Sequence, residues 1–254
     1  MNRLKLTYGS VLICLVGCFI GLGTANAQLV MTPDNYLGPI KSELQVKWPK
    51  NRTINLVFHG HSVPSGYLTR GIVNTLQSYP YLLLKKVKDR YPFAVVNTIT
   101  TSIGGEQSQK GAKRVKKEVL VHRPDVLFID YALNDRSIGL ERSKVAWEKM
   151  IRKAKAYGTK VILMTPTPDL KENIQSPDAE LAKHSQQIRE MAKKYEVGLV
   201  DNYAMFKEMA GNQSLEKWMA QNNHINTLGH ELVAETLLTL FWEEDSSNKE
   251  PNDL

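Results

Sequence analysis

Residues 126–131 read Val-Leu-Phe-Ile-Asp-Tyr (VLFIDY), a nearly continuous apolar run that is followed by the polar pair Asn134 and Asp135. A short run of this kind, rich in aliphatic and aromatic residues, predicts a strand that is buried on both faces of a sheet. Comparable runs, each bounded by turn residues, recur at 54–58, 94–98, 161–165 and 198–200. The chain therefore contains several candidate strands of a buried sheet.

Amphipathic stretches separate these apolar runs. Helical periodicity covers residues 79–90, 110–122, 140–157, 179–195 and 228–241. Strands that alternate with helices predict an α/β fold of three layers, with a central parallel sheet of about five strands between helices. Functional groups of such folds lie beyond the carboxyl ends of the strands, so the residues that follow each strand are the candidates for a site.

The first 27 residues have the layout of a secretory signal peptide. Arg3 and Lys5 precede an apolar run at 11–22, and residues 25–27 (Ala-Asn-Ala) fit a cleavage site. The apolar run is shorter than a membrane span. We therefore expect an exported protein, periplasmic or secreted. In the alternative interpretation, residues 15–18 (Leu-Val-Gly-Cys) are a bacterial lipobox, and a lipidated Cys18 attaches the protein to a membrane.

The remaining 227 residues are expected to comprise a lead-in at 28–50, a hydrolase domain at 51–242 and a polar tail at 243–254. At 254 residues and 42% hydrophobic composition, the chain has enough apolar material for the core of one domain. Its two cysteines, Cys14 and Cys18, both lie in the signal segment. After cleavage at Ala27, the mature chain would therefore have neither a disulfide nor a thiol nucleophile.

The net charge is +7, and basic residues gather in stretches such as 110–117. We interpret them as solvated helix faces, and the absence of a nucleic-acid motif predicts no nucleic-acid partner. His59, His122 and His184 show no spacing typical of metal ligands, so we expect neither a metal nor another cofactor.

The residues that follow the expected strands suit acyl transfer. Ser62 follows the first strand, Gly105 the second and Asn134 the third, while His224 precedes the last helix. A serine hydroxyl is a weak nucleophile until a base such as histidine removes its proton. The oxyanion that forms on attack needs hydrogen-bond donors already directed at it. All of these groups are expected at one edge of one sheet.

The order of these motifs resembles that of the SGNH (GDSL-type) hydrolase superfamily over residues 50–242. The serine lies in a Gly-His-Ser version (60–62) of the family's Gly-Asp-Ser block, and Gly105, Asn134 and His224 match the other three blocks. The resemblance implies a flavodoxin-like fold, with Ser62 as nucleophile and His224 as base. It also implies an oxyanion hole made by the N–H groups of Ser62 and Gly105 and the side-chain amide of Asn134.

Two departures from the family pattern bear on the mechanism. His61 stands where the family has aspartate, and it is a less favoured alternative base. Gln221 stands where the family has the aspartate that orients the catalytic histidine. The orienting acceptor could instead be the side-chain oxygen of Gln221 or Asn222, or a backbone carbonyl that leaves a serine–histidine dyad. A weak or inactive site is the remaining alternative.

The positions of four other residues in the sequence suggest roles for them. Asp201 is interpreted as a turn or helix-cap residue, with a displaced triad acid as the alternative. Glu106 is a further candidate for orienting His224, and Tyr67, close after the serine, is a candidate for lining a substrate cleft. His230, on the last helix, is interpreted as a packing or surface residue.

The function expected from the motifs and the resemblance is that of an exported serine esterase. By analogy with the family, it would remove short acyl groups, acetyl above all, from carbohydrates. Its partners would be small-molecule or polysaccharide esters. The alternatives are an inactive carbohydrate-binding relic of the same fold, favoured by Gln221, and an acyltransferase that passes the acyl group to a sugar.

Overall fold

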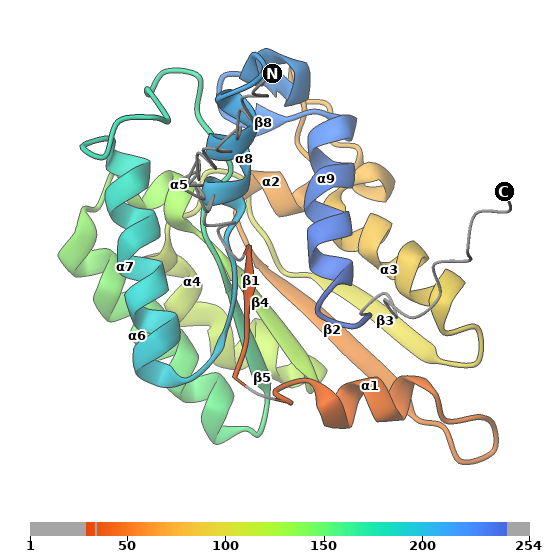
Figure 1. The fold of residues 1–254 in the computed structure, drawn as a ribbon. Coiled ribbons are helices and arrows are strands. Elements are labelled where there is room, and N and C mark those ends of the chain that lie inside the picture. Colours follow the sequence, from red (N-terminus) through yellow and green to blue (C-terminus); the bar gives the residue numbers. More distant parts are fainter. Residues whose placement is uncertain (1–28, 34, 243–254) are drawn as a thin grey trace, which may run out of the picture.

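The computed structural model describes residues 29–33 and 35–242, which form three layers with a sheet in the middle (Figure 1). The expected signal peptide at 1–27, with the alternative lipobox cysteine Cys18, and the expected polar tail at 243–254 lie outside the described residues. In the described part the sheet has six strands, in the order β1-β6-β5-β4-β2-β3. These strands are β1 (Val30–Met31), β2 (Thr53–Gly60), β3 (Val95–Thr100), β4 (Val126–Asp130), β5 (Lys160–Met164) and β6 (Gly198–Val200).

Five of the six strands, β2 to β6, run parallel, which confirms the expected α/β class. Their order across the sheet is that of flavodoxin-like folds, in which the chain direction across the sheet reverses between the first and third parallel strands. Here that switch point lies between β2 and β4. The sixth strand, β1, pairs antiparallel with β6 at one edge and comes from the lead-in segment.

Nine α-helices in the described part connect and cover the strands. They are α1 (Gly38–Leu44), α2 (Ser62–Ser65), α3 (Tyr79–Arg90), α4 (Ser108–Arg114), α5 (Ala132–Asp135), α6 (Leu140–Ala156), α7 (Glu180–Tyr195), α8 (Asn202–Ala210) and α9 (Thr227–Leu238). A small hairpin of β7 (Met219–Gln221) and β8 (His224–Ile225) precedes α9. The expected helix over 110–122 is instead α4 followed by π-helical (Val115–Val119) and 3₁₀ (Leu120–His122) turns.

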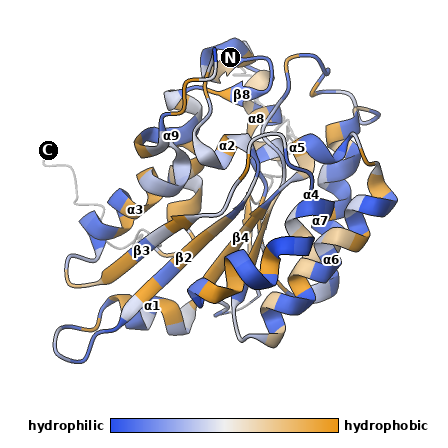
Figure 2. Cartoon of the chain, turned by 180° about the vertical axis from the view of Figure 1, so that it is seen from behind, coloured by the Kyte–Doolittle hydropathy of each residue, from blue (hydrophilic) through white to orange (hydrophobic). Residues whose placement is uncertain are grey.

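Alternate residues of each buried strand pack against opposite helix layers. Phe58 and Phe128 face one layer, where α1, α3, α8 and α9 lie, and their rings stack at 4.3 Å. Val57 and Leu127 face the other layer, made by α4, α6 and α7. Figure 2 shows the apolar strands between helices whose outer faces are hydrophilic. Burial on both sides explains why the strands are continuous apolar runs in the sequence.

Candidate active site

Ser62 begins α2 directly after β2, at the carboxyl edge of the sheet. Gly60 makes this turn possible, because a Cβ atom there would lie 2.4 Å from the backbone oxygen of Asp130 on the neighbouring strand. Gly66 ends α2 in the left-handed conformation, with φ of 86°. The serine is thereby held on a short, tightly enclosed turn at the switch point of the sheet.

His224 meets Ser62 across 162 residues of sequence. Its Nε2 atom lies 2.8 Å from Ser62 Oγ. The histidine is placed by β8, and α9 starts directly after it, with the Asn226 side chain accepting from the N–H of Gly229 at the helix N-terminus. The hairpin and the start of α9 thus bring the ring over α2, and the two side chains lie within hydrogen-bonding distance.

The other ring nitrogen of His224 faces a backbone carbonyl. Its Nδ1 atom lies 3.1 Å from the oxygen of Leu68, in the loop that follows α2. Gln221 contacts the same Nδ1 through its amide nitrogen Nε2, not through the side-chain oxygen expected to accept from the ring. Asn222 instead uses its backbone oxygen to accept from the N–H of Leu170 at 2.7 Å. Of the two expected orienting side chains, the structure therefore brings Gln221 to the histidine, and sequence reasoning had not singled out Leu68.

Backbone hydrogen bonds hold the Leu68 carbonyl in this position. The N–H of Leu68 donates to Ile72 O at 2.8 Å, and the N–H of Asn74 donates to Gly66 O at 2.8 Å. Tyr67 and Val73 form an isolated antiparallel bridge in the same loop. No sequence motif marks a carbonyl of this kind, because every residue carries one.

Burial lowers the pKa of His224, and the hydrogen bond from its ring to Leu68 O opposes that effect. A lowered pKa keeps the ring neutral at neutral pH, so one ring nitrogen has a free lone pair. With the ring hydrogen on Nδ1, where Leu68 O accepts it, Nε2 can accept from the Ser62 hydroxyl. The carbonyl thereby favours the tautomer that a general base requires.

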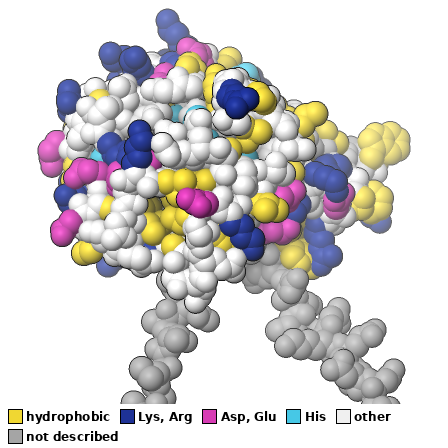
Figure 3. Space-filling view, turned by 90° about the horizontal axis from the view of Figure 1, so that it is seen from above, with side chains coloured by type: hydrophobic (Ala, Val, Ile, Leu, Met, Phe, Trp, Pro, Cys, Tyr) yellow, Lys and Arg dark blue, Asp and Glu magenta, His cyan; other side chains and the backbone are white. Residues whose placement is uncertain are grey.

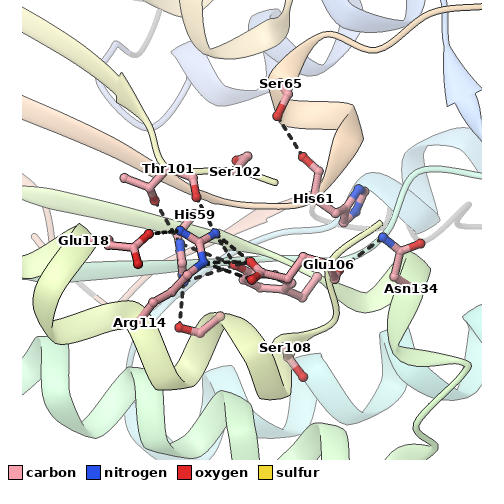
Figure 4. A network of polar contacts seen from close by, with 12 residues as sticks. His59, His61, Ser65, Thr101, Ser102, Glu106, Ser108, Arg114, Glu118 and Asn134 are labelled. Carbon is pink, nitrogen blue, oxygen red and sulfur yellow. Dashed lines mark hydrogen bonds and ion pairs between the residues drawn. The ribbon is translucent and has the colours of Figure 1, made fainter. Parts of the chain in front are cut away.

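Gly105 and Asn134 lie on the loops that follow β3 and β4. Gly105 is exposed and has φ of 72°, a left-handed conformation that favours glycine. Asn134 lies on α5 and donates from Nδ2 to the backbone oxygen of Glu106 at 3.2 Å, as Figure 4 shows. This contact joins the two loops that carry the expected oxyanion donors. The third expected donor, the N–H of Ser62, is at the start of α2, where N–H groups have no acceptor within the helix.

Tyr67 lies beside both the glycine loop and His224. A Cβ atom added at Gly104 would lie 3.1 Å from Cζ of Tyr67, and the tyrosine ring centroid is 6.2 Å from that of His224. The tyrosine thus lies between the glycine loop and the histidine. Seen from above, this edge of the molecule exposes hydrophobic and histidine side chains near one another (Figure 3).

His61 is buried beneath the serine turn and does not share the position of His224. Its Nδ1 accepts from the N–H of Val63 at 3.2 Å, and its Nε2 lies 3.3 Å from Asp130 Oδ1. Asp130 also accepts from the hydroxyl of Tyr79 at 3.0 Å. The histidine that replaces the family aspartate therefore lies beside a buried carboxylate below the turn, although neither His61 Nε2 nor Asp130 Oδ1 has a hydrogen bond to any described residue.

Three other candidate residues have structural contacts. Asp201 caps α8 by accepting from the N–H of Ala204 at 3.0 Å, and it pairs with Arg189 at 2.6 Å. The ring of His230 is buried and its Nδ1 accepts from the N–H of Tyr79. The carboxylate of Glu106 pairs with Arg114, not with His224. These contacts agree with cap and packing roles for Asp201 and His230.

Among the described residues, no group of three or more histidine, cysteine, aspartate or glutamate side chains is arranged to hold a metal ion. A cavity of about 580 Å³ lies between β1 and α7, and its lining contains none of the residues near Ser62. Within residues 29–33 and 35–242, no helix combines the length and apolar composition needed to cross a membrane.

A flavodoxin-like sheet with a serine, a histidine, a glycine loop and an asparagine at its switch point defines the class of carboxylic ester hydrolases of the SGNH type. Residues 58–232 match the GDSL-like Lipase/Acylhydrolase family, and the chain belongs to that family. The resemblance seen in the four sequence motifs is thereby confirmed, and the chain is by class a carboxylic ester hydrolase.

Similar proteins include one curated relative and several solved structures. The chain is 24% identical over 195 residues to the uncharacterized lipoprotein YqeF of Bacillus subtilis (strain 168), covering 65% of this chain and 79% of that protein. A two-domain esterase active on acetylated mannans is 22% identical, with a TM-score of 0.67, over 85% of this chain and 56% of that one. The present chain thus spans little more than half the length of the two-domain esterase.

A variant of an acetyl-xylooligosaccharide esterase from Geobacillus stearothermophilus has the same fold, with a TM-score of 0.67 and 20% identity. That match covers 76% of this chain and 95% of the esterase. At these identities the solved structures establish the common fold, which confirms the expected architecture.

Proposed function

We propose that this chain hydrolyses carboxylic esters of short acyl groups through a Ser62 acyl-enzyme, with His224 as the base. The observation that carries the proposal is the 2.8 Å separation of Ser62 Oγ and His224 Nε2. A base within this distance can take the hydroxyl proton as the oxygen attacks. The second carrying feature is that Nδ1 of the same ring faces the carbonyl of Leu68, at 3.1 Å.

In the first half-reaction, His224 removes the proton of Ser62 while Oγ forms a bond to the ester carbonyl carbon. The carbonyl oxygen becomes an oxyanion, which the N–H groups of Ser62 and Gly105 and the Asn134 amide would stabilise. His224 then donates its proton to the alkoxy oxygen as the carbon–oxygen bond of the ester breaks. The alcohol leaves and the acyl group remains on Ser62.

In the second half-reaction, His224 takes a proton from water, and the resulting hydroxide attacks the acyl carbon. The oxyanion forms and collapses at the same donors, and the proton returns to Ser62 Oγ as the acid departs. The positive charge on His224 in each transition state has no partner carboxylate in this mechanism. Leu68 O is the acceptor that faces Nδ1, and the amide of Gln221 contacts the same nitrogen through Nε2.

Acetylated carbohydrates are the substrates we propose. Solved structures similar to this chain include an esterase active on acetylated mannans and an acetyl-xylooligosaccharide esterase, which supports an acetyl ester. Tyr67 adds a flat apolar ring beside His224, a surface against which a sugar ring can pack. Export is part of the proposal, and it rests on the signal layout of residues 1–27 together with the lipoprotein name of YqeF.

The test is acetate release from acetylated xylo- and manno-oligosaccharides, with p-nitrophenyl acetate, butyrate and octanoate to rank acyl length. We expect acetyl esters to be cleaved fastest and Ser62→Ala to lose on the order of 10⁵–10⁶ in kcat. The matched control is Ser65→Ala, on the same helix, whose hydroxyl donates to His61 O. Equal activity of wild type and Ser62→Ala would refute the proposed nucleophile.

An inactive carbohydrate-binding relic is the second candidate, because a glutamine replaces the family's acid at Gln221. A fluorophosphonate probe separates the two. We expect the probe to label the wild-type chain at Ser62 and to leave Ser62→Ala unlabelled. Binding of oligosaccharides without any labelling would favour the relic.

A further inference from the structure

The loop that carries Gly105 is closed by a single guanidinium. Arg114, on α4, donates to the backbone oxygen of Thr101 at one end of the loop and to the carboxylate of Glu106 at the other. Its Nε lies 3.0 Å from each carboxylate oxygen of Glu106, and its Nη2 lies 2.6 Å from Oε2. Residues 102–105, Gly105 among them, are held between these two anchors (Figure 4).

Glu106 connects this clamp to the other expected oxyanion donor. Its carboxylate is 6% exposed, and it also accepts from the hydroxyl of Tyr131 at 2.8 Å. Its backbone oxygen accepts from the Nδ2 of Asn134 at 3.2 Å. Glu106 therefore contacts Arg114, which holds the glycine loop, through its carboxylate. It also contacts Asn134, an expected oxyanion donor, through its backbone oxygen.

We propose that Glu106 and Arg114 are positioning residues, whose buried ion pair aims the N–H of Gly105 and the amide of Asn134 at the oxyanion. This inference rests on the proposed function. Both groups act through other residues, since neither carboxylate nor guanidinium is among the contacts of Ser62 or His224. Preorganised donors stabilise an oxyanion only if they already point at it, so the loop that carries them has to be rigid.

The neighbouring histidine, His59, does not compete with Arg114 for the carboxylate of Glu106. His59 lies beside Tyr131, and burial together with the charge of Arg114 lowers the pKa of His59 to about 3. The imidazole is therefore neutral, and it bridges Thr101 Oγ1 at 2.8 Å and Gly111 O at 3.2 Å. Arg114 remains the cation nearest to Glu106 in these contacts, and His59 tethers the same strand end that Arg114 holds.

Tyr131 packs against α4 at Gly111. A Cβ atom there would lie 2.4 Å from both Cζ and Oη of Tyr131. The close approach places the tyrosine hydroxyl within reach of Glu106. Stability alone is a weak reason for a buried ion pair, because apolar side chains of similar volume often stabilise a fold as well or better. The need to hold the two oxyanion donors in a fixed position explains the Glu106–Arg114 pair better than stability does.

The test compares two carboxylates that bind the same guanidinium. Glu106 is buried, whereas Glu118 lies 3.0 Å from Arg114 Nη1 with its side chain 54% exposed and faces away from the loop. We expect Glu106→Gln to lower kcat for p-nitrophenyl acetate by about 10²-fold at unchanged KM, the scale of a misplacement near 1 Å. The matched variant Glu118→Gln should remain within about twofold of wild type.

Rates are counted per serine titrated with the fluorophosphonate probe, so that loss of folded protein does not register as loss of kcat. In an Asn134→Ala background, the effect of Glu106→Gln should shrink, because one of the two donors that Glu106 positions is gone. If Glu106→Gln does not fold, Tyr131→Phe removes one hydrogen bond to Glu106, and we expect it to lower kcat by roughly tenfold.

Equal kcat values for Glu106→Gln, Glu118→Gln and wild type would overturn the inference. A full, multiplicative effect of Glu106→Gln in the Asn134→Ala background would overturn the part of it that concerns Asn134. Wild-type kcat in Tyr131→Phe would also overturn the inference if Glu106→Gln proves unfolded. The proposed function fails separately, through retained activity of Ser62→Ala. Loss of activity in Ser62→Ala together with wild-type behaviour of Glu106→Gln would leave the serine mechanism and remove only the positioning role.

Discussion

The backbone oxygen of Leu68 lies 3.1 Å from Nδ1 of His224, in the place where the family pattern has a carboxylate. A carbonyl carries no net charge, so it fixes the ring tautomer while stabilising the imidazolium less than aspartate does. The amide of Gln221 contacts the same nitrogen, and its oxygen and nitrogen exchange places by rotation of the amide. In the proposed mechanism the site is therefore a serine–histidine dyad in which a neutral carbonyl, Leu68 O, accepts from the ring.

Removal of the Gln221 side chain should have a small effect, because the Leu68 carbonyl remains. We expect Gln221→Ala to lower kcat by less than about tenfold, against about 10⁴ for the loss of a triad acid in a serine protease. Kinetics with p-nitrophenyl acetate, per titrated serine, measure this. A loss near 10⁴ would show that Gln221 itself takes the role of the acid.

The complementary variant restores a carboxylate. Gln221→Asp places a negative charge near Nδ1, which raises the pKa of His224. The acid limb of the pH–rate profile should therefore move to higher pH than in the wild type, and kcat should be retained or increased. An unchanged limb would mean that the new carboxylate does not reach the ring.

The pH dependence of the wild type follows from the burial of His224. Burial lowers its pKa from the usual 6.5, and the base acts only when neutral. Activity should consequently rise with pH to a plateau, with the midpoint of the acid limb below 6.5. Measurement of kcat/KM for p-nitrophenyl acetate between pH 4 and 9 reports the free enzyme. A midpoint above 6.5 would contradict the assignment of His224 as the titrating base.

Asn134 tests the oxyanion hole. Loss of one preorganised donor typically costs about 10²–10³ in kcat, so Asn134→Ala should show a decrease of that size with little change in thermal midpoint. The amide lies half-buried at the site edge and its hydrogen bond to Glu106 O is 3.2 Å long. Asn173→Ala removes the same group from the loop after β5, where it accepts from Gln175, and should leave kcat unchanged.

Two buried histidines should make the fold sensitive to acid. Burial lowers the pKa of His59 and of His230 to about 3, whereas in the unfolded chain both titrate near 6.5. Between these values the unfolded state binds more protons, so the free energy of unfolding falls as pH falls from about 6.5 towards 3. Each histidine contributes at most about 1.4 kcal/mol per pH unit.

Urea unfolding at a series of pH values measures this slope. In His230→Gln, one titrating group is removed while an acceptor for the N–H of Tyr79 is kept. Its unfolding free energy should depend less on pH than that of the wild type across the same window. Parallel curves for the two proteins would show that His230 does not carry the acid sensitivity.

The periodicity of the sequence predicted the main elements because burial determines it. Four of the parallel strands, β2, β4, β5 and β6, bury apolar side chains on both faces, whereas the edge strand β3 is only partly buried. α3 has the expected bounds of Tyr79–Arg90. Several short elements escaped prediction, and β1 and α8 illustrate two different reasons. β1 consists of Val30 and Met31 alone, which is too short to show a period, and it needs β6 as a partner. α8 follows the cap residue Asp201 directly and was not distinguished from the strand end before it.

The sequence by itself determined which groups follow which strands, and hence the order of serine, glycine, asparagine and histidine along the sheet edge. It also showed that no carboxylate stands three residues before His224. Both properties are local, since the type of a residue and its distance along the chain suffice to state them.

Only the tertiary structure decided what takes the place of that carboxylate and what holds the donors. Leu68 O reaches His224 from 156 residues away, and a backbone carbonyl has no signature in sequence because every residue has one. The carboxylate of Glu106 was a candidate partner of His224, yet folding places Arg114 and Tyr131 against it. Hydrogen bonds depend on directions and distances within an ångström, and these are fixed only when the separate segments pack together.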